Sequence, residues 1–285
     1  MSEGQDRPAW SEQFLPEALH RLGLSAPLRH ITREIAWGGS TGRGVRVAVV
    51  DTGVEADHPV FDGHVSGGVI IELNDQVEDG FVAIPDNPPR DVAGHGTACA
   101  GIIHGLAPEA EIFSVRVLGD NMRGRALTFA AGIEWAIMNR FDVVNMSLST
   151  SSEDLRMLFY ELADAAYFKN VTLVCAVNNI PAPSYPSTFA SVISVAAHHA
   201  RDPWTYYYNP APPVEFGAPG IDVEVAWVNK QVATNTGNSF AAPHITGIVA
   251  LIRAKHPDLT PFQLKTMLMA CAANVRQEGD APAAP

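Results

Sequence analysis

The sequence predicts an α/β fold with three layers, in which a mostly parallel β-sheet carries helices on both faces. Short apolar segments rich in β-branched residues alternate with helical segments along most of the chain, a pattern typical of parallel sheets. The first of them, Val45–Gly53, ends in Asp and Gly, as a buried strand with a functional tip does. With 285 residues, 47 % of them hydrophobic and 18 % charged, the chain can bury a large core.

Each element follows from its local pattern. Five strands are expected from apolar, β-branched runs: 45–53, 112–118, 143–148, 171–177 and 192–197. Five helices are expected between and after them: 98–103 (opened by 94–97), 126–139, 154–168, 239–254 and 261–272. Thr260 supplies an N-cap for the last helix and Pro261 its first residue. Residues 62–93, rich in Gly, Pro and Asp, are expected to be irregular, with a hairpin around 69–71.

One main domain is expected, because no internal repeat or linker interrupts the pattern. It covers residues 41–275, after a lead-in of residues 1–40 that holds a short helix at 18–24. A tail of residues 276–285, rich in Ala and Pro, is expected to fray.

Composition and charge exclude several classes of function. The formal net charge of −12 makes nonspecific binding to nucleic acid or to an anionic membrane unfavourable. No stretch has the length and hydropathy of a membrane span, and the polar N-terminus lacks a signal sequence. A cytoplasmic location is therefore expected, or secretion if a signal has been trimmed. The three cysteines lie in apolar runs without zinc-like spacing, which predicts buried, reduced thiols.

Three side chains with complementary chemistry fall where strands end or helices begin. Asp51 ends the first strand, His95 opens a helix between two glycines, and Ser239 opens the apolar helix 239–254. Taken singly, each has a structural explanation as a turn or capping residue. Taken together, they supply a nucleophile, a base and a carboxylate that orients the base, at the carboxyl edge of one sheet. Asn179, at another strand tip, can donate its amide to an oxyanion or form an Asx-turn.

The sequence resembles the subtilisin-like serine proteases, or subtilases, over about residues 40–275. Four blocks in the family's order carry the resemblance: Val49–Gly53 with His58–Pro59, Gly94–Gly101, Asn145–Leu148, and Gly237–His244. The resemblance implies peptide-bond hydrolysis, with Ser239 as nucleophile, His95 as general base and acid, and Asp51 orienting the imidazole. Asn179 and the Ser239 N–H would form the oxyanion hole.

The same resemblance implies where a peptide or protein substrate binds. Residues 145–149 would form an edge segment that pairs with an extended substrate. The specificity pocket would lie between Ser149 and Thr150 on one side and Ala176, Val177 and Asn178 on the other. The implied substrate-binding residues are Asn145, Ser147, Leu148, Ser149, Thr150, Ala176, Val177 and Asn178.

Departures from the family pattern carry information of their own. Side chains stand at 149, 150 and 178 where the family often has glycine, which predicts a small or restricted P1 residue. The usual Gly-Asn of the oxyanion segment is Asn178-Asn179, which leaves open which amide faces the substrate. Phe240 replaces the family's usual methionine, which predicts resistance to peroxide. Arg123 and Arg125 lie on a stretch that in the family often borders a more distant subsite; they either favour acidic substrate residues or are solvated loop arginines.

We expect no cofactor and no metal. The family's calcium-binding loop is missing from residues 101–108, and Val60 stands where an aspartate ligand would follow His58-Pro59. The pair His198-His199 with Asp202 lacks further ligands at metal-binding spacing and is interpreted as a surface pair.

Two other functions use the same fold. One is a catalytically silent binding module, against which the complete set of Asp51, His95 and Ser239 argues. The other is a transpeptidase or cyclase, in which Ser239 transfers the acyl group to an amine; no large insertion that could exclude water is visible. About forty residues before the core are too few for the family's usual propeptide domain, so a mature form or an intracellular type is expected. The sequence leaves open the oligomeric state of the protein and its substrate, for instance a particular peptide precursor.

Overall fold

The structure, a computed structural model, describes residues 31–211 and 213–275. The helix expected at 18–24 and the tail 276–285 therefore lie outside the described residues. The compact unit that contains the sheet begins at Thr32, before the boundary expected at residue 41. In it, the short helix α1 (Arg33–Trp37) packs against a long helix, α5 (Asn238–Lys255).

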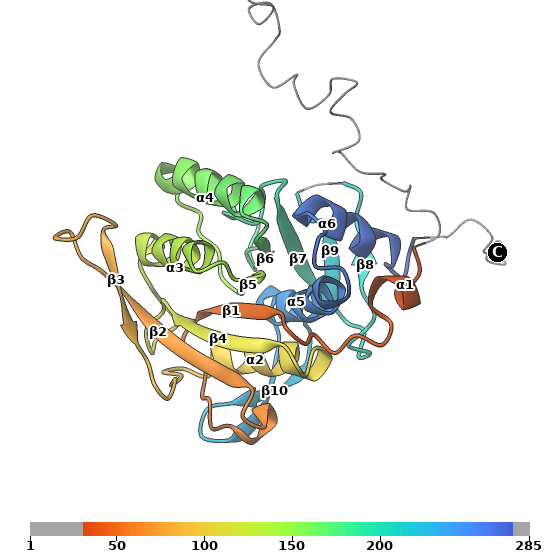
Figure 1. The fold of residues 1–285 in the computed structure, drawn as a ribbon, viewed down its shortest axis with the longest axis horizontal. Coiled ribbons are helices and arrows are strands. Elements are labelled where there is room, and N and C mark those ends of the chain that lie inside the picture. The colour runs from red at the N-terminus through yellow and green to blue at the C-terminus, as the bar shows by residue number, and fades with distance from the viewer. Residues whose placement is uncertain (1–30, 212, 276–285) are drawn as a thin grey trace, which may run out of the picture. The chain divides into compact units, whose positions relative to one another are not determined.

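A nine-stranded sheet forms the centre of this unit, in the order β3-β2-β4-β1-β5-β6-β7-β9-β8 (Figure 1). All neighbouring pairs are parallel except β2–β3 and β8–β9 at the two edges. The strands are β1 (Arg46–Asp51), β2 (Val65–Leu73), β3 (Phe81–Pro85), β4 (Glu111–Arg116), β5 (Val143–Met146), β6 (Thr172–Ala176), β7 (Val192–His198), β8 (Tyr207–Tyr208) and β9 (Phe216–Pro219). A separate hairpin joins β10 (Val223–Trp227) and β11 (Gln231–Asn235).

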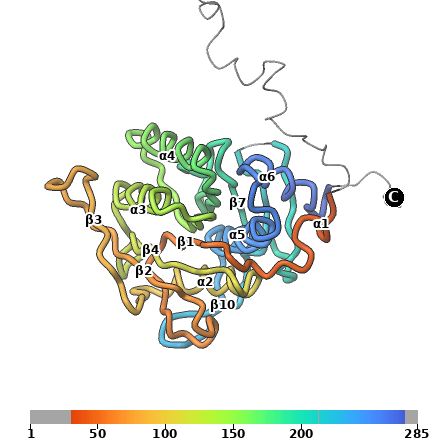
Figure 2. The backbone as a smooth tube through the Cα atoms, viewed as in Figure 1, coloured from red at the N-terminus to blue at the C-terminus, as the bar shows by residue number. Residues whose placement is uncertain are grey.

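Helices cover both faces of the sheet, as Figure 2 shows for α3 (Ala126–Met138) and α4 (Arg156–Phe168) on one side and α2 (His95–Leu106) on the other. α5 packs against α2 and against β5, β6, β7 and β9, and α6 (Pro261–Ala270) packs against α5. Short 3₁₀ turns cover Pro59–Phe61 (η3) and Glu153–Leu155 (η4). The predicted cap of α6 is present, since Thr260 Oγ1 accepts a hydrogen bond from the Gln263 N–H.

Side chains of the parallel strands alternate between the two faces of the sheet, and helices cover both faces. Val50 and Met146 pack with Phe129 of α3 and Phe159 of α4 in one core, and all four are at most 2 % exposed. Strands that bury both faces read as continuous apolar runs, which is the pattern seen in the sequence. The three-layer, mostly parallel α/β fold is thereby confirmed.

The expected elements are present, with ends shifted by a few residues. The hairpin expected around 69–71 is confirmed as β2 paired with β3. The strands β8, β9, β10 and β11 were not anticipated between residues 199 and 235, because they are two to five residues long and β9 contains Gly and Pro.

Candidate active site

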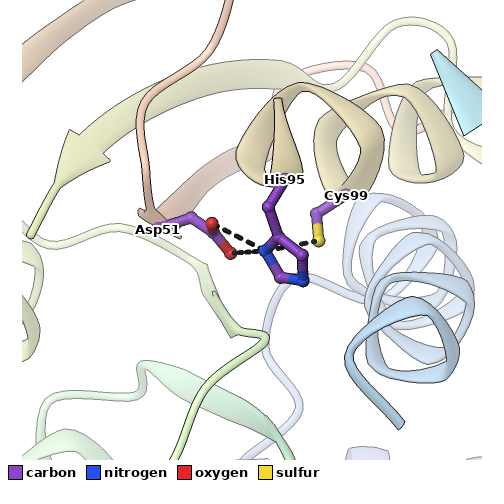
Figure 3. A group of neighbouring side chains, drawn as sticks. All are labelled: Asp51, His95 and Cys99. Atoms are coloured by element: carbon purple, nitrogen blue, oxygen red, sulfur yellow. Dashed lines mark hydrogen bonds and ion pairs between the residues drawn. The ribbon is translucent and has the colours of Figure 1, made fainter. Parts of the chain in front are cut away.

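Asp51 and His95 meet at the carboxyl end of β1. His95 Nδ1 lies 2.8 and 2.9 Å from the two carboxylate oxygens of Asp51. Figure 3 marks both contacts with dashed lines. The approach depends on Gly96, the second residue of α2, because a Cβ there would lie 2.0 Å from the Gly53 carbonyl oxygen. The first turn of α2 can therefore press against the loop after β1 only with glycine at this position.

Asp91 fixes the loop that leads into His95. Its Oδ1 accepts hydrogen bonds from the N–H groups of Ala93 and Gly94 and from Thr52 Oγ1, at 2.7–2.9 Å. Its Oδ2 accepts from the N–H and Oγ1 of Thr97, at 2.8 and 2.7 Å. Sequence reasoning missed this residue, although an aspartate shortly before a helix is a usable capping signal.

The Asp51–His95 pair is buried, and this changes the acidity of the imidazole. The Asp51 side chain is fully buried and that of His95 is 13 % exposed. Burial acts to lower the pKa of His95, but the Asp51 carboxylate acts in the opposite direction and prevails, so the pKa lies well above its usual value of 6.5. Because a carboxylate only accepts, Nδ1 carries the proton of the neutral ring and Nε2 keeps its lone pair.

Cys99 lies one turn after His95 and contacts it, as Figure 3 shows. Its Sγ is 4.0 Å from His95 Nδ1 and donates to the Ser239 carbonyl oxygen at 3.6 Å. Burial raises the pKa of the Cys99 thiol above its usual value, so it stays protonated at neutral pH. Asp51, His95 and Cys99 form a group within 4.8 Å that could ligate a metal ion, but its imidazole and carboxylate are already paired with each other. All three cysteines are free and buried, as expected.

Ser239 is the second residue of α5, and its carbonyl has an unusual set of donors. In a regular helix this oxygen would accept from the N–H four residues later, but that residue is Pro243, which has none. Ser147 Oγ donates to it at 2.7 Å instead, together with Cys99 Sγ. The first turn of α5 is thereby attached to the segment after β5 and to α2.

Asn145 and Ser147 act as part of this support. Asn145 Nδ2 donates to Ser147 Oγ at 3.1 Å, and Asn145 Oδ1 accepts from Thr246 Oγ1 of α5 at 2.8 Å. Both side chains are buried, at 0 % and 5 % exposure. The expectation that Asn145 begins an edge segment is wrong, because β5 pairs with β1 on one side and β6 on the other.

Asn238 holds the start of α5 against the ends of two strands. Its Oδ1 accepts from the Ala197 N–H at 2.9 Å, and its Nδ2 donates to the carbonyls of Val177 and Asn178 at 3.2 and 3.0 Å. Sequence reasoning also missed this positioning role.

Among the described residues, no hydrogen bond joins Ser239 Oγ to His95, but both residues contact Cys99 and the His95 ring lies 5.3 Å from that of Phe240. Such bonds are often long or absent before substrate binds.

The two asparagines of the segment 178–179 are used differently. Asn178 Oδ1 accepts from Ser149 Oγ at 3.1 Å, and its Nδ2 donates to the Pro183 carbonyl at 2.6 Å. Asn179 Oδ1 accepts from the Asn238 N–H at 2.9 Å, and in the described part of the chain its Nδ2 has no protein acceptor. A Cβ built on Gly237 would lie 3.2 Å from Ser239 Oγ and 3.7 Å from Asn179 Nδ2, so both groups border one small space.

The remaining expected substrate-binding residues differ in how deeply they are buried and in what they contact. Ala176 ends β6 and is 3 % exposed, and Val177 is half-buried. Leu148, also half-buried, packs on the core below α3 and α4. Thr150 forms an antiparallel bridge with Tyr185, with N–H···O distances of 2.9 and 2.8 Å.

A carboxylate and an imidazole beside a serine at the carboxyl edge of a parallel sheet are the components of a serine hydrolase. Comparison with known proteins gives the family. The model of the subtilase family matches residues 42–283, and the chain belongs to that family.

Named relatives agree with this assignment. The minor extracellular protease Epr of Bacillus subtilis (strain 168) is 33 % identical over 244 residues, which are 81 % of this chain and 35 % of that protein. Subtilisin E of the same organism is 32 % identical over 251 residues, which are 82 % of this chain and 62 % of that protein. A solved structure of a cold adapted subtilisin-like serine proteinase matches with a TM-score of 0.65 and 26 % identity, over 84 % of this chain and 88 % of the other.

These comparisons also show how much of each relative's length the chain spans, and they bear on its cellular location. The chain spans about a third of the length of Epr and about three fifths of that of subtilisin E. One relative is named as extracellular, and nothing in the comparisons supports the expected cytoplasmic location. Within residues 31–211 and 213–275, no helix has both the length and the apolarity needed to cross a membrane.

Proposed function

We propose that this chain is a serine endopeptidase that hydrolyses peptide bonds of peptide or protein substrates. The observation that carries the proposal is the contact of His95 Nδ1 with both carboxylate oxygens of Asp51, at 2.8 and 2.9 Å, beside the first turn of α5. That contact leaves Nε2 as the free basic nitrogen of the neutral imidazole. Membership of the subtilase family supports the same chemistry.

The proposed reaction proceeds in two steps. Ser239 Oγ attacks the scissile carbonyl while His95 Nε2 takes its proton, and His95 then returns this proton to the leaving amine. Water hydrolyses the resulting acyl-enzyme with His95 again as general base. Asp51 holds the ring in its tautomer and stabilises the imidazolium that forms in each step. Rotation of the Ser239 side chain about its Cα–Cβ bond is the movement needed to join Oγ to Nε2.

Asn179 Nδ2 and the Ser239 N–H form the proposed oxyanion hole. The hydrogen bond from the Asn238 N–H to Asn179 Oδ1 orients this amide, so that its NH2 group remains available. The Ser239 N–H belongs to the first turn of α5, where the helix dipole adds a positive partial charge. Asn178 lacks this capacity, because both ends of its amide already have protein partners.

Restricted specificity follows from the two walls implied for the P1 pocket. The hydrogen bond from Ser149 Oγ to Asn178 Oδ1 joins them, and the bond from Asn178 Nδ2 to the Pro183 carbonyl holds Asn178 in place. A large P1 side chain would have to break this link, so glycine or alanine is the expected P1 residue. Such a requirement suits the processing of a particular peptide precursor.

An active-site probe tests the proposed chemistry directly. A fluorophosphonate should label Ser239 in the full chain and leave the Ser239→Ala variant unlabelled. Absence of label on the folded protein would favour a silent binding module. Mass spectrometry of peptide products then separates cut peptides, which we expect, from joined or cyclised ones, which would indicate a transpeptidase.

A cleavage profile on a peptide library tests the specificity. Ser149→Gly removes the link between the walls and should raise kcat/KM for a P1 phenylalanine relative to a P1 alanine by about tenfold, as expected when an occluding contact is removed. Ser151→Gly, an exposed change in the same loop, is the matched control and should leave the ratio unchanged. A wild-type preference for large P1 residues would contradict the wall-to-wall link.

A further inference from the structure

A cavity of about 430 Å³ lies between α2, the segment leading into β10, and the loop around residue 203. None of the residues that line it is among those expected to act in catalysis or substrate binding. Its volume is within the range of small-molecule pockets. Its apolar walls come from Ile102, Leu106, Pro203, Pro219, Ile221 and Val223.

One polar group lines this cavity from the buried side, the imidazole of His244. The residue is 5 % exposed. Its Nδ1 lies 2.9 Å from the Phe240 carbonyl oxygen, which only accepts, so Nδ1 carries the proton. The lone pair is then on Nε2, for which the described residues offer no partner. Burial lowers the pKa of His244 to about 4, so the ring is neutral at pH 7.

The chemistry of the walls selects the ligand. Nε2 faces the cavity without a donor from the described residues, and a ligand that brings an O–H or N–H can donate to it there. An anionic ligand is disfavoured, because the exposed rim carries the two carboxylates Asp222 and Glu224. Among the described residues that line the cavity, Arg201 alone supplies a positive charge to offset them. A metal ion is disfavoured as well, since in the described residues no group of three ligating side chains includes His244.

We propose that this cavity binds a neutral, mainly apolar small molecule that carries one hydrogen-bond donor, of the phenol or indole class. Its ring lies between the aliphatic side chains of α2 and those around Ile221, and its O–H or N–H donates to His244 Nε2. The site is separate from the proposed oxyanion hole and P1 pocket, so occupation of one does not exclude occupation of the other.

Matched pairs of probes test the donor requirement. Phenol is compared with anisole, and indole with N-methylindole, since each second compound has a similar ring without the donor. The titrations use the full chain carrying Ser239→Ala, which prevents self-digestion, and follow the ¹⁵N signals of the imidazoles by NMR. We expect phenol to bind about fivefold more tightly than anisole, the effect of one net hydrogen bond. The His244 Nε2 signal should move in the direction of an accepted hydrogen bond.

Two tryptophan variants test the location without altering His244. Ile221→Trp fills the cavity and should weaken phenol binding by roughly tenfold or more. Val232→Trp adds the same side chain at a position that is 63 % exposed and outside the cavity, and it should leave binding unchanged. Equal affinity for phenol and anisole, an unmoved His244 signal, or equal binding by the two variants would each overturn the proposal, as would no saturable binding of any probe.

Discussion

Replacement of Asn179 tests which of two adjacent asparagines, Asn178 or Asn179, serves the proposed oxyanion hole, a choice that the sequence leaves open. Asn179→Ala removes the Nδ2 donor from the proposed oxyanion hole. In subtilisin itself, removal of the oxyanion-hole asparagine lowers kcat by about 10²–10³, and we carry that measured magnitude over to Asn179. Asn178→Ala removes two hydrogen bonds, to Ser149 Oγ and the Pro183 carbonyl, but no group that faces Ser239. Its kcat should therefore stay within about threefold of wild type, a change of less than 1 kcal/mol.

Asn179 has a second role, which a further variant isolates. Its Oδ1 accepts the Asn238 N–H at the start of α5, so Asn179→Ala also loses a capping bond worth about 1 kcal/mol of stability. Asn179→Asp keeps an oxygen for this N–H and removes only the NH2 group. We expect this variant to unfold at the temperature of wild type and to have a kcat lower than that of Asn179→Ala, since a carboxylate beside the oxyanion repels it.

The assay is steady-state hydrolysis of a peptide with alanine at P1, together with thermal unfolding of each variant. The reasoning predicts a loss in kcat with KM little changed, because the donor acts on charge that exists only in the transition state. If Asn179→Asp retained wild-type kcat, or if Asn178→Ala lost as much activity as Asn179→Ala, the assignment of Asn179 to the oxyanion hole would be refuted.

Three further predictions concern pH, oxidation and calcium. His95 must be neutral to act as the proposed base, and Asp51 raises its pKa. The value of kcat/KM should therefore fall as the pH drops, with a midpoint above pH 6.5. A midpoint at or below pH 6.5 would contradict this. Peroxide should leave the wild type active, because Phe240 has no sulfur to oxidise and the neighbouring Cys99 thiol is buried and protonated. Phe240→Met places an oxidisable thioether beside Ser239 and should make the protein sensitive to peroxide. Inactivation of the wild type with a modified residue beside Ser239 would argue against this reasoning. A chelator should leave the melting temperature unchanged, because α2 runs from His95 to Leu106 without the family's calcium loop; a fall of several degrees would count against it.

The sequence predicted the fold well where elements are uniformly apolar. Buried parallel strands such as β1 and β6 read as continuous apolar runs, and α5 as a long apolar helix after a glycine turn. The meeting of Asp51 and His95 was predictable too, because in a parallel sheet the strand ends and the starts of the following helices share one edge. The short strands β8–β11 were not, since they are specified by pairing with neighbours and not by local pattern.

Side-chain orientation was the part that the sequence could not supply. Asn178 and Asn179 are identical residues at adjacent positions, and their partners determine which NH2 group remains free. Asn178 Nδ2 donates to the Pro183 carbonyl, whereas among the described residues Asn179 is held through its Oδ1, by the N–H of Asn238. Asn238 lies 59 residues away along the chain, so no local pattern reveals the pairing. The same holds for Asn145, whose amide faces Thr246 of α5 and not an added strand.

Pro243 shows how a departure from a local rule positions Ser239, the proposed nucleophile. A proline inside a helix removes one N–H, and here the carbonyl that loses its donor belongs to Ser239. Ser147 from the segment after β5 and Cys99 from α2 donate to that oxygen in its place. A regular helix would have satisfied the carbonyl internally and left the first turn of α5 without these contacts. Because α2 also carries His95, the missing N–H fixes the backbone of Ser239 relative to His95, as the proposed proton transfer between them would require.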